Sequence, residues 1–279
     1  MTDQSKSTQL LASGFAMGES ARWHNDRFWL SDWGAQEIIA LKPEGGCESS
    51  LAVSCALPFC FDWHLDGSLL VVSGQEARLL RQDAGHSLTR FVDLSAISTS
   101  IWNEIVVDGR GNAYINSAEA IALVTPTGSV RKVADGGEFP NGMVVTPDNG
   151  TLLLAESHGK RLTAFDISSD GSLSNRRLWA ALRGPPDGIC LDAEGAVWYA
   201  DVPNKQCVRV RGGGEILLTV EVDRGCFSCA LGGPDRRTLF IVATEWRGMD
   251  KVAEVAAART GQVLTFRAPA PAPDRRATP

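Results

Sequence analysis

The chain has 279 residues, of which 44% are hydrophobic and 22% charged, and this composition indicates a globular protein that can form one large domain. Lys and Arg number 27 against 33 Asp and Glu, giving a net charge of −6 without a basic run. A polyphosphate would gain little electrostatic attraction from such a chain, so the composition disfavours nucleic acid as a partner, and we predict none.

Two further features bear on the compartment. No stretch approaches the roughly 18 apolar residues of a membrane span, and the N-terminus lacks the basic start and apolar run of a secretion signal. The chain has seven cysteines, an odd number, which favours reduced thiols. We therefore predict a cytoplasmic protein without a membrane partner; the sequence does not indicate an oligomeric state.

A repeated pattern organises most of the chain. Each copy has a short apolar run, a turn rich in Asp, Gly and Pro that suits a hairpin, and a second β-rich run. In chain order the copies are SARWHNDRFWLSD after Glu19, DWHLDGSLLVVSG after Phe61, NEIVVDGRGNAYI from Asn103, NGMVVTPDNGTLLLAES from Asn141, DGICLDAEGAVWYAD from Asp187 and FSCALGGPDRRTLFIVATEW from Phe227. They recur at roughly 40 residues, the repeat length of a propeller blade.

These repeats predict an all-β fold, a six-bladed β-propeller over residues 9–266. The last copy shows too few strands of its own, so we expect residues 9–15 to supply its outer strand and close the ring. Residues 1–8 and the Pro/Ala-rich tail 267–279 are predicted to be disordered. The hairpin-turn histidines, His24 and His64, are expected to face solvent.

Polar residues begin four of the six copies, namely Glu19, Asn103, Asn141 and Asp187. The innermost strands of a propeller start around one mouth, where grouped polar side chains cost free energy unless they are paired or bind something. Carboxylate and amide oxygens are hard donors that favour Ca²⁺, Mg²⁺ or Mn²⁺, and the absence of His and Cys at these starts argues against a dedicated zinc site. A plain turn function remains the alternative, because Asn-Gly and Asp-Gly pairs are common in turns.

Several of these segments resemble one known family. MGESARWH at 17–24, FPNGMVVTPDN at 139–149, PPDGICLDAEGAVW at 185–198 and the Trp102-Asn103-Glu104 segment resemble the SMP-30/gluconolactonase/luciferin-regenerating family. The resemblance implies a six-bladed propeller with one divalent cation. It matches the metal ligands of the family to Glu19, Asn141 and Asp187, and a further asparagine beside metal and substrate to Asn103.

The chain departs from the family around Asn103. Family members often carry Asn-Asp where this chain has Asn103-Glu104, and sugar-lactone members carry arginine at the position of Ile101. The indole of Trp102 suggests a pocket wall that is flatter and more apolar than in the sugar-lactone members. We therefore interpret Asn103, Glu104 and Trp102 as substrate-binding residues for a small molecule whose identity the sequence leaves open.

The resemblance implies metal-assisted hydrolysis of a lactone, a gluconolactonase-like reaction. A metal ion stabilises the oxyanion that develops on the carbonyl oxygen. Asp187 is the expected metal ligand and base for the attacking water, with Asn103 joining Glu19 and Asn141 at the metal. Ca²⁺ is favoured as the cation, with Zn²⁺, Mn²⁺ and Mg²⁺ as alternatives.

Two other functions stay open at this point. A propeller can bind calcium without catalysis and serve as a regulatory or scaffold module, since a fold does not fix a function. The same metal site can also suit an aryl ester or phosphotriester hydrolase. Turnover of lactones compared with paraoxon, with and without a chelator, separates these alternatives.

Overall fold

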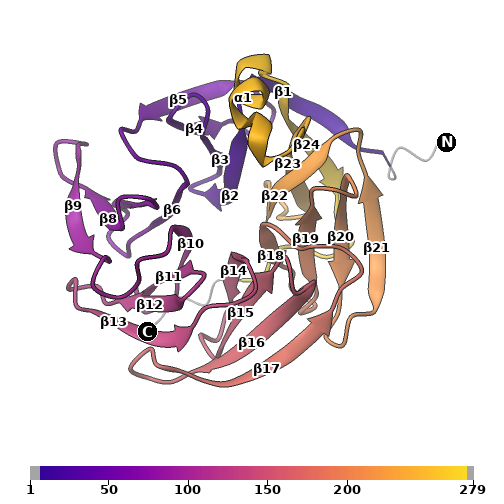
Figure 1. The fold of residues 1–279 in the computed structure, drawn as a ribbon. Coiled ribbons are helices and arrows are strands. Elements are labelled where there is room, and N and C mark those ends of the chain that lie inside the picture. The colour runs from indigo at the N-terminus through magenta and orange to yellow at the C-terminus, as the bar shows by residue number, and fades with distance from the viewer. Residues whose placement is uncertain (1–6, 275–279) are drawn as a thin grey trace. The chain divides into compact units, whose positions relative to one another are not determined.

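A computed structural model describes residues 7–274 and confirms the predicted all-β fold. The 24 strands of this part of the chain form six four-stranded antiparallel sheets, the blades of a six-bladed β-propeller (Figure 1). The chain divides into two compact units. Unit 1 contains the residues up to Val53 together with Gly184–Pro273, and unit 2 contains Ser54–Arg183. Each unit holds three blades.

Unit 1 is built from both ends of the chain. Its first blade has the strand order β2 (Gly18–His24), β3 (Arg27–Asp32), β4 (Glu37–Leu41) and β5 (Cys47–Ala52). Its second has β18 (Ile189–Leu191), β19 (Val197–Asp201), β20 (Gln206–Val210) and β21 (Ile216–Glu221). Its third has β22 (Gly225–Gly232), β23 (Thr238–Thr244), β24 (Gly261–Arg267) and, at the outer edge, β1 (Gln9–Phe15).

The N-terminal strand completes the last blade, as the sequence predicts. Strand β1 pairs antiparallel with β24, with Gln9 opposite Thr265 and Phe15 opposite Gly261. The two backbones come so close at the second pair that a Cβ on Gly261 would lie 2.6 Å from the Phe15 carbonyl oxygen. Glycine is therefore needed where the first strand of the chain meets the last.

Unit 2 is one continuous piece of chain with the same strand order in each blade. Its first blade contains β6 (Phe59–Trp63), β7 (Leu69–Ser73), β8 (Arg78–Gln82) and β9 (Leu88–Asp93). Its second contains β10 (Trp102–Val107), β11 (Ala113–Ser117), β12 (Ala120–Val124) and β13 (Val130–Asp135). Its third contains β14 (Pro140–Val145), β15 (Thr151–Glu156), β16 (Arg161–Ile167) and β17 (Leu173–Ala181).

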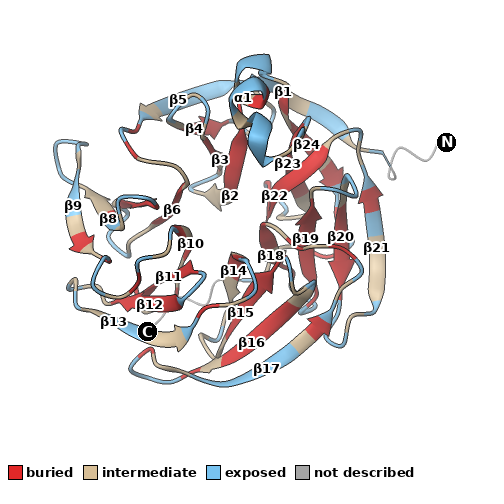
Figure 2. Cartoon of the chain, in the orientation of Figure 1, coloured by how far each residue is buried: buried red, intermediate tan, exposed pale blue. Residues whose placement is uncertain are grey.

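Burial falls from the middle of each blade to its outer edge. Every residue of β11, β12 and β19 is buried, whereas β5 and β13 contain no buried residue (Figure 2). Strands covered on both faces read as near-continuous apolar runs, which explains why the sequence shows imperfect alternation. The apolar middle strands pair with the innermost strands, which carry the polar residues predicted to bind the metal ion.

The C-terminal tail differs from its prediction. Residues 1–6 and 275–279, expected to be disordered, lie outside the described residues. Within the rest of the tail, Ala268 and Ala270 are buried, and the Ala268 N–H donates to the Arg237 carbonyl oxygen at 2.8 Å. The prediction of disorder was wrong for this segment, because its alanines pack on the apolar core of unit 1 despite the Pro-rich composition.

One short helix was not predicted from the sequence. Between β23 and β24 lie a 3-10 turn, Met249–Lys251, and helix α1, Val252–Ala258. Only Val255 of α1 is fully buried. In the described part of the chain no helix has the length and apolar character needed to cross a membrane.

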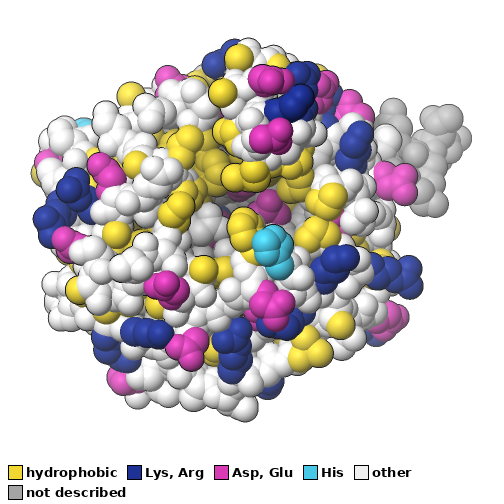
Figure 3. Space-filling view, viewed as in Figure 1, with side chains coloured by type: hydrophobic (Ala, Val, Ile, Leu, Met, Phe, Trp, Pro, Cys, Tyr) yellow, Lys and Arg dark blue, Asp and Glu magenta, His cyan; other side chains and the backbone are white. Residues whose placement is uncertain are grey.

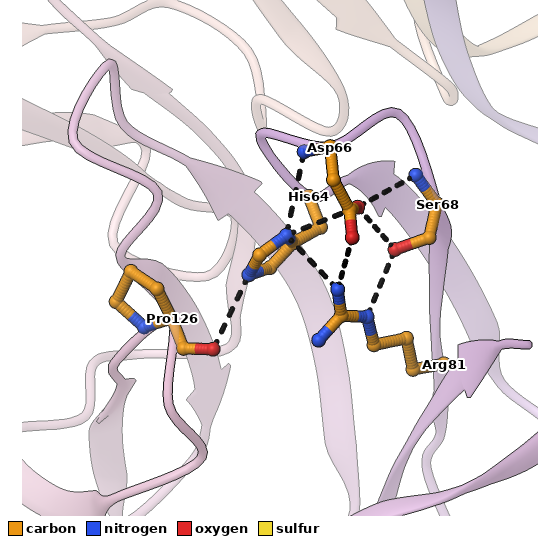
Figure 4. A network of polar contacts seen from close by, with 5 residues as sticks. All are labelled: His64, Asp66, Ser68, Arg81 and Pro126. Atoms are coloured by element: carbon orange, nitrogen blue, oxygen red, sulfur yellow. Dashed lines mark hydrogen bonds and ion pairs between the residues drawn. The ribbon is translucent and has the colours of Figure 1, made fainter.

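His64 is half-buried, contrary to its prediction as a solvent-facing turn residue. Its side chain is 11% exposed. The imidazole Nδ1 lies 3.1 Å from Asp66 Oδ1, and Nε2 lies 3.3 Å from the Pro126 carbonyl oxygen in the neighbouring blade (Figure 4). Arg81 contacts both Asp66 and Ser68. The turn thus links two blades of unit 2, a contact that its local sequence does not reveal.

Candidate metal and catalytic site

Glu19 lies at the beginning of β2 in unit 1, where the strand is irregular. The register of β2 against β3 shifts between Glu19 and Arg22, and Ser20 has a φ of 52°. Such left-handed backbone is uncommon outside glycine and occurs often at functional sites. The Ser20 N–H donates to Glu19 Oε2 at 3.1 Å, and the residue is only 7% exposed. The bulge therefore fixes a carboxylate at the start of the innermost strand.

Asp187 comes just before β18, also in unit 1. Its N–H donates to the Ala200 carbonyl oxygen at 2.9 Å, and the Gly188 N–H donates to the Phe227 carbonyl oxygen at 2.9 Å. A Cβ on Gly188 would lie 2.4 Å from Ser228 Oγ, so only glycine allows β18 to approach β22 this closely. The glycine of the Pro-Asp-Gly motif thus positions the aspartate before it.

Ser228 of β22 lies between the backbone that follows Glu19 and the backbone that follows Asp187, and it was not predicted. Its Oγ accepts a hydrogen bond from the Ala21 N–H at 3.0 Å, while its other side faces Gly188. Strand β22 contacts both β2 and β18. Unit 1 therefore carries Glu19 and Asp187 on two strands that share one neighbour.

Unit 2 brings together the two predicted asparagines. Asn103 of β10 donates from Nδ2 to Asn141 Oδ1 at 3.3 Å and to the Pro140 carbonyl oxygen at 3.0 Å. Asn141 of β14 donates in turn to Ser157 Oγ at 3.4 Å. Residues 38 positions apart thus meet at the starts of neighbouring inner strands, as the repeat register predicts.

Asn116 is a positioning residue that the sequence did not single out. This fully buried side chain of β11 donates from Nδ2 to the Asn141 carbonyl oxygen at 2.7 Å and accepts the Glu104 N–H at Oδ1 at 3.3 Å. One amide thereby ties the backbone beside Asn103 to the backbone of Asn141. The only sequence signal is an asparagine inside a β-rich run, where asparagine is depleted.

Two predicted substrate residues lie deeper than expected. Glu104 is 4% exposed, and its Oε1 accepts the Ile105 N–H at 2.8 Å. Trp102 is fully buried, so it offers no surface to a substrate and the prediction of a pocket wall is wrong for this structure. Successive side chains of a strand point to opposite faces, which turns Trp102 away from the face that Asn103 occupies.

The donors at these positions suit a hard cation. Within unit 1 the donors are the carboxylates of Glu19 and Asp187, and within unit 2 they are the amide oxygens of Asn103 and Asn141. Burying a carboxylate as far as that of Glu19 costs free energy unless another charge or hydrogen bonds compensate it. Among residues 7–274 no group of three or more His, Cys, Asp or Glu side chains is placed to hold a metal ion.

Charged side chains of both signs are mixed on the face of the molecule drawn in Figure 3. On the face drawn in Figure 3, Lys and Arg side chains are interspersed with Asp and Glu, and hydrophobic side chains gather beside α1. Most described arginines of unit 2 lie within ion-pair distance of a carboxylate, such as Arg177 with Asp166 at 2.7 Å.

The sequence matches the family described as "SMP-30/Gluconolactonase/LRE-like region" over residues 17–245. Pentonolactonase XacC of Haloferax volcanii is 25% identical over 252 residues, covering 84% of each chain. Regucalcin of Xenopus laevis is 33% identical over 133 residues, covering 45% of this chain and less than half, 44%, of the frog protein.

Solved structures agree with these matches at the level of the fold. A calcium-binding protein, regucalcin, from Agrobacterium tumefaciens superposes with a TM-score of 0.78 at 20% identity, covering 97% of this chain and 98% of that one. A luciferin-regenerating enzyme superposes with a TM-score of 0.80 at 16% identity, covering 96% and 97%. With the family match extending over most of its length, this chain belongs to the SMP-30/gluconolactonase/LRE-like family.

Proposed function

We propose that this protein is a metal-dependent hydrolase that opens a lactone, a cyclic ester, by attack of water. The observation that carries the proposal is the equivalent position of four oxygen-donor residues at the starts of inner strands, in a chain whose relatives include proteins named as lactonases. The proposed ligands of one divalent cation are Glu19, Asn141 and Asp187, with Asn103 beside them. Ca²⁺ is the favoured ion.

Each side chain has a distinct proposed role. When bound, the cation supplies positive charge that stabilises the oxyanion developing on the lactone carbonyl oxygen. Asp187 accepts the proton of the attacking water. Asn103, held by its hydrogen bonds to β14, orients the lactone, and Glu104 fixes the backbone next to it. Holding water and carbonyl in place contributes up to about 7–11 kcal/mol in ideal cases.

The proposed substrate is a lactone less hydroxylated than the sugar lactones. Ile101, at the position where sugar-lactone members carry arginine, is 53% exposed and offers an apolar side chain. An apolar contact cannot hydrogen-bond a sugar hydroxyl, whereas it can cover an alkyl substituent. We expect kcat/KM to be higher for an alkyl-substituted γ- or δ-lactone than for gluconolactone, measured on one panel with pH-indicator detection.

Removing the cation tests the proposal directly. We expect a chelator to abolish lactone hydrolysis and Ca²⁺ to restore it, because the cation supplies the positive charge that stabilises the oxyanion. At a free Ca²⁺ concentration 100 times its Kd, binding adds about 2.7 kcal/mol to the free energy of unfolding, which a thermal-shift assay detects. Hydrolysis that persists unchanged after chelation would contradict the proposed mechanism.

A second candidate is calcium binding without catalysis, favoured by the relatives named regucalcin. This function predicts the same Ca²⁺-dependent rise in Tm without turnover of any lactone in the panel. Paraoxon hydrolysis faster than that of every lactone would instead indicate a phosphotriester or aryl ester hydrolase. The same two assays thus distinguish all three functions.

Asn116 provides a test of positioning inside unit 2. The Asn116→Leu variant loses both hydrogen bonds that connect β10, β11 and β14, so we expect lactone kcat/KM to fall about tenfold or more. Asn112→Leu is the matched control, because Asn112 is also a buried asparagine but bonds Asp108 instead, at 3.0 Å. Both variants are expected to lower Tm, and only Asn116→Leu is expected to weaken Ca²⁺ binding. Equal activities in the two variants would rule out the positioning role.

All seven cysteines are free thiols, in keeping with a reducing compartment, and we propose a cytoplasmic location.

A further inference from the structure

Four cysteines gather in unit 1 where the blade of β18–β21 packs on the blade that contains β22. Cys207, Cys226 and Cys229 are buried in one hydrophobic cluster, and Cys190 packs against it while keeping partial exposure. The function proposed above uses none of these thiols. The clustering of four thiols at one contact between blades therefore needs a separate explanation.

Two of the thiols face each other across this contact. Cys190 Sγ of β18 lies 3.8 Å from Cys229 Sγ of β22. The backbones are held together two residues earlier in each strand, where the Gly188 N–H bonds the Phe227 carbonyl oxygen at 2.9 Å. Cys229 Sγ also lies 3.7 Å from the Gly188 carbonyl oxygen, so its side chain leans toward β18. A disulfide has an S–S distance of about 2 Å, so the two sulfurs, 3.8 Å apart, must move closer for the bond to form.

The surroundings distinguish the roles of the two sulfurs. Burial raises the pKa of Cys190 well above its usual range, so this thiol stays protonated. Hydrogen bonds from the Cys190 and Cys207 thiols lower the pKa of Cys229 to about 5, which favours its thiolate. The thiolate is the nucleophilic form of cysteine. We assign Cys229 as the attacking sulfur because it contacts a neighbouring thiol and has the lowered pKa, and Cys190, 3.8 Å away, as the thiol that follows.

We propose that Cys190 and Cys229 form a redox-active dithiol that a hydroperoxide converts into a disulfide joining β18 to β22. The Cys229 thiolate attacks the O–O bond of hydrogen peroxide, forming a sulfenic acid as hydroxide leaves. Cys190 sulfur then attacks the Cys229 sulfur, its proton joins the departing hydroxyl, and water leaves. The hydroxide takes up the proton that Cys229 released on ionising, so two thiols lose two electrons in total and one peroxide is reduced to two waters.

The disulfide has a structural consequence at the candidate site. It would join strands three residues after Asp187, and it would shift the Cys229 sulfur that lies 3.7 Å from the Gly188 carbonyl oxygen. Closing the segment between residues 190 and 229 also restricts the unfolded chain, which raises Tm. Formation of the bond itself does not depend on the proposed lactonase function.

The test uses the purified full chain treated with hydrogen peroxide, alkylated and mapped by peptide mass spectrometry without reduction. We expect a Cys190–Cys229 crosslinked peptide, the loss of two titratable thiols, and recovery of both on reduction. The Cys190→Ser and Cys229→Ala variants should form no such peptide, whereas Cys60→Ser, which removes another buried thiol outside the cluster, should form it normally. Circular dichroism checks that each variant is folded.

Other outcomes overturn the proposal. A Cys207–Cys229 bond would show that the resolving thiol is misassigned. Oxidation confined to the exposed Cys47, at a peroxide concentration that leaves Cys190 and Cys229 reduced, would show that the buried pair is inert. The wild-type peptide map decides the question even if a cysteine variant fails to fold.

Discussion

Replacing Asp187 with alanine is expected to lower kcat/KM for lactone hydrolysis by about 10³-fold, within the 10²–10⁴ range typical of a lost general base. The variant also loses a proposed metal ligand, so its Ca²⁺-dependent rise in Tm should shrink. The fold should persist, because the backbone N–H of residue 187 and the Gly188 approach to β22 do not involve the side chain.

Asp223→Ala serves as the matched control for this experiment. Asp223 is an aspartate of unit 1 whose side chain is 69% exposed and pairs with Arg224, so its loss should leave turnover and Ca²⁺ binding unchanged. Initial rates, Ca²⁺ titration by calorimetry and circular dichroism are measured for both variants. Full activity in Asp187→Ala, with the fold intact, would remove Asp187 from the mechanism.

Replacing Glu156 with leucine is expected to lower the free energy of unfolding by about 3 kcal/mol, the lower end of the values for breaking a buried ion pair. The Glu156 side chain is 0% exposed and accepts hydrogen bonds from Arg161 at 2.7 Å, Arg176 at 3.1 Å and the hydroxyl of Thr163. The two guanidinium groups keep partial contact with water, which limits the loss. Urea denaturation followed by circular dichroism and fluorescence measures it.

Glu138→Gln is the control, because Glu138 pairs with the same Arg161 at 3.0 Å but is 60% exposed. Exposed ion pairs contribute about 0–1 kcal/mol, so this variant should stay close to wild type. Equal losses in the two variants would show that burial does not decide the strength of this network.

The pH dependence of stability gives a second measurement on Glu156. Burial opposes ionisation, but hydrogen bonds from Arg161 and Thr163 outweigh it and lower the pKa of Glu156 from 4.5 to about 2. The stabilisation is therefore complete above about pH 4.5 and is lost as the pH falls toward 2. By linkage the shift corresponds to about 3 kcal/mol. Glu156→Leu should show a correspondingly shallower decline over this window; an unchanged decline would contradict the shift.

The blades themselves could be predicted because their signals are local. Turns such as DGRG and TPDNG, spaced at roughly 40 residues, define the hairpins and their number. The same register placed Asn103 and Asn141 at equivalent positions, and the structure finds them in contact. The pairing of β1 with β24 followed from the missing edge strand of the last copy.

The contacts that could not be predicted from the sequence depend on which strands lie next to each other in the fold. The hydrogen bond of Asn116 to the Asn141 backbone exists only because β11 and β14 are neighbours. The contact of His64 with the Pro126 carbonyl oxygen likewise depends on the packing of two blades. The buried alanines after Arg267 look like a flexible tail until the cluster that receives them is known. Trp102 was misplaced for another reason: a bulge and an alternation of faces decide its direction, and proximity in sequence to Asn103 does not.

The pairing of β1 with β24 also sets an order for synthesis on the ribosome. Strands β6–β17 of unit 2 come from one uninterrupted segment, so their sheets can form while the remainder of the chain is still being translated. Strand β1 is made first and must wait for Gly261–Arg267, nearly the whole length of the chain, before its partner exists. During that interval its edge is open to wrong partners, and Leu10, which is 58% exposed in the folded chain, adds apolar surface to that edge.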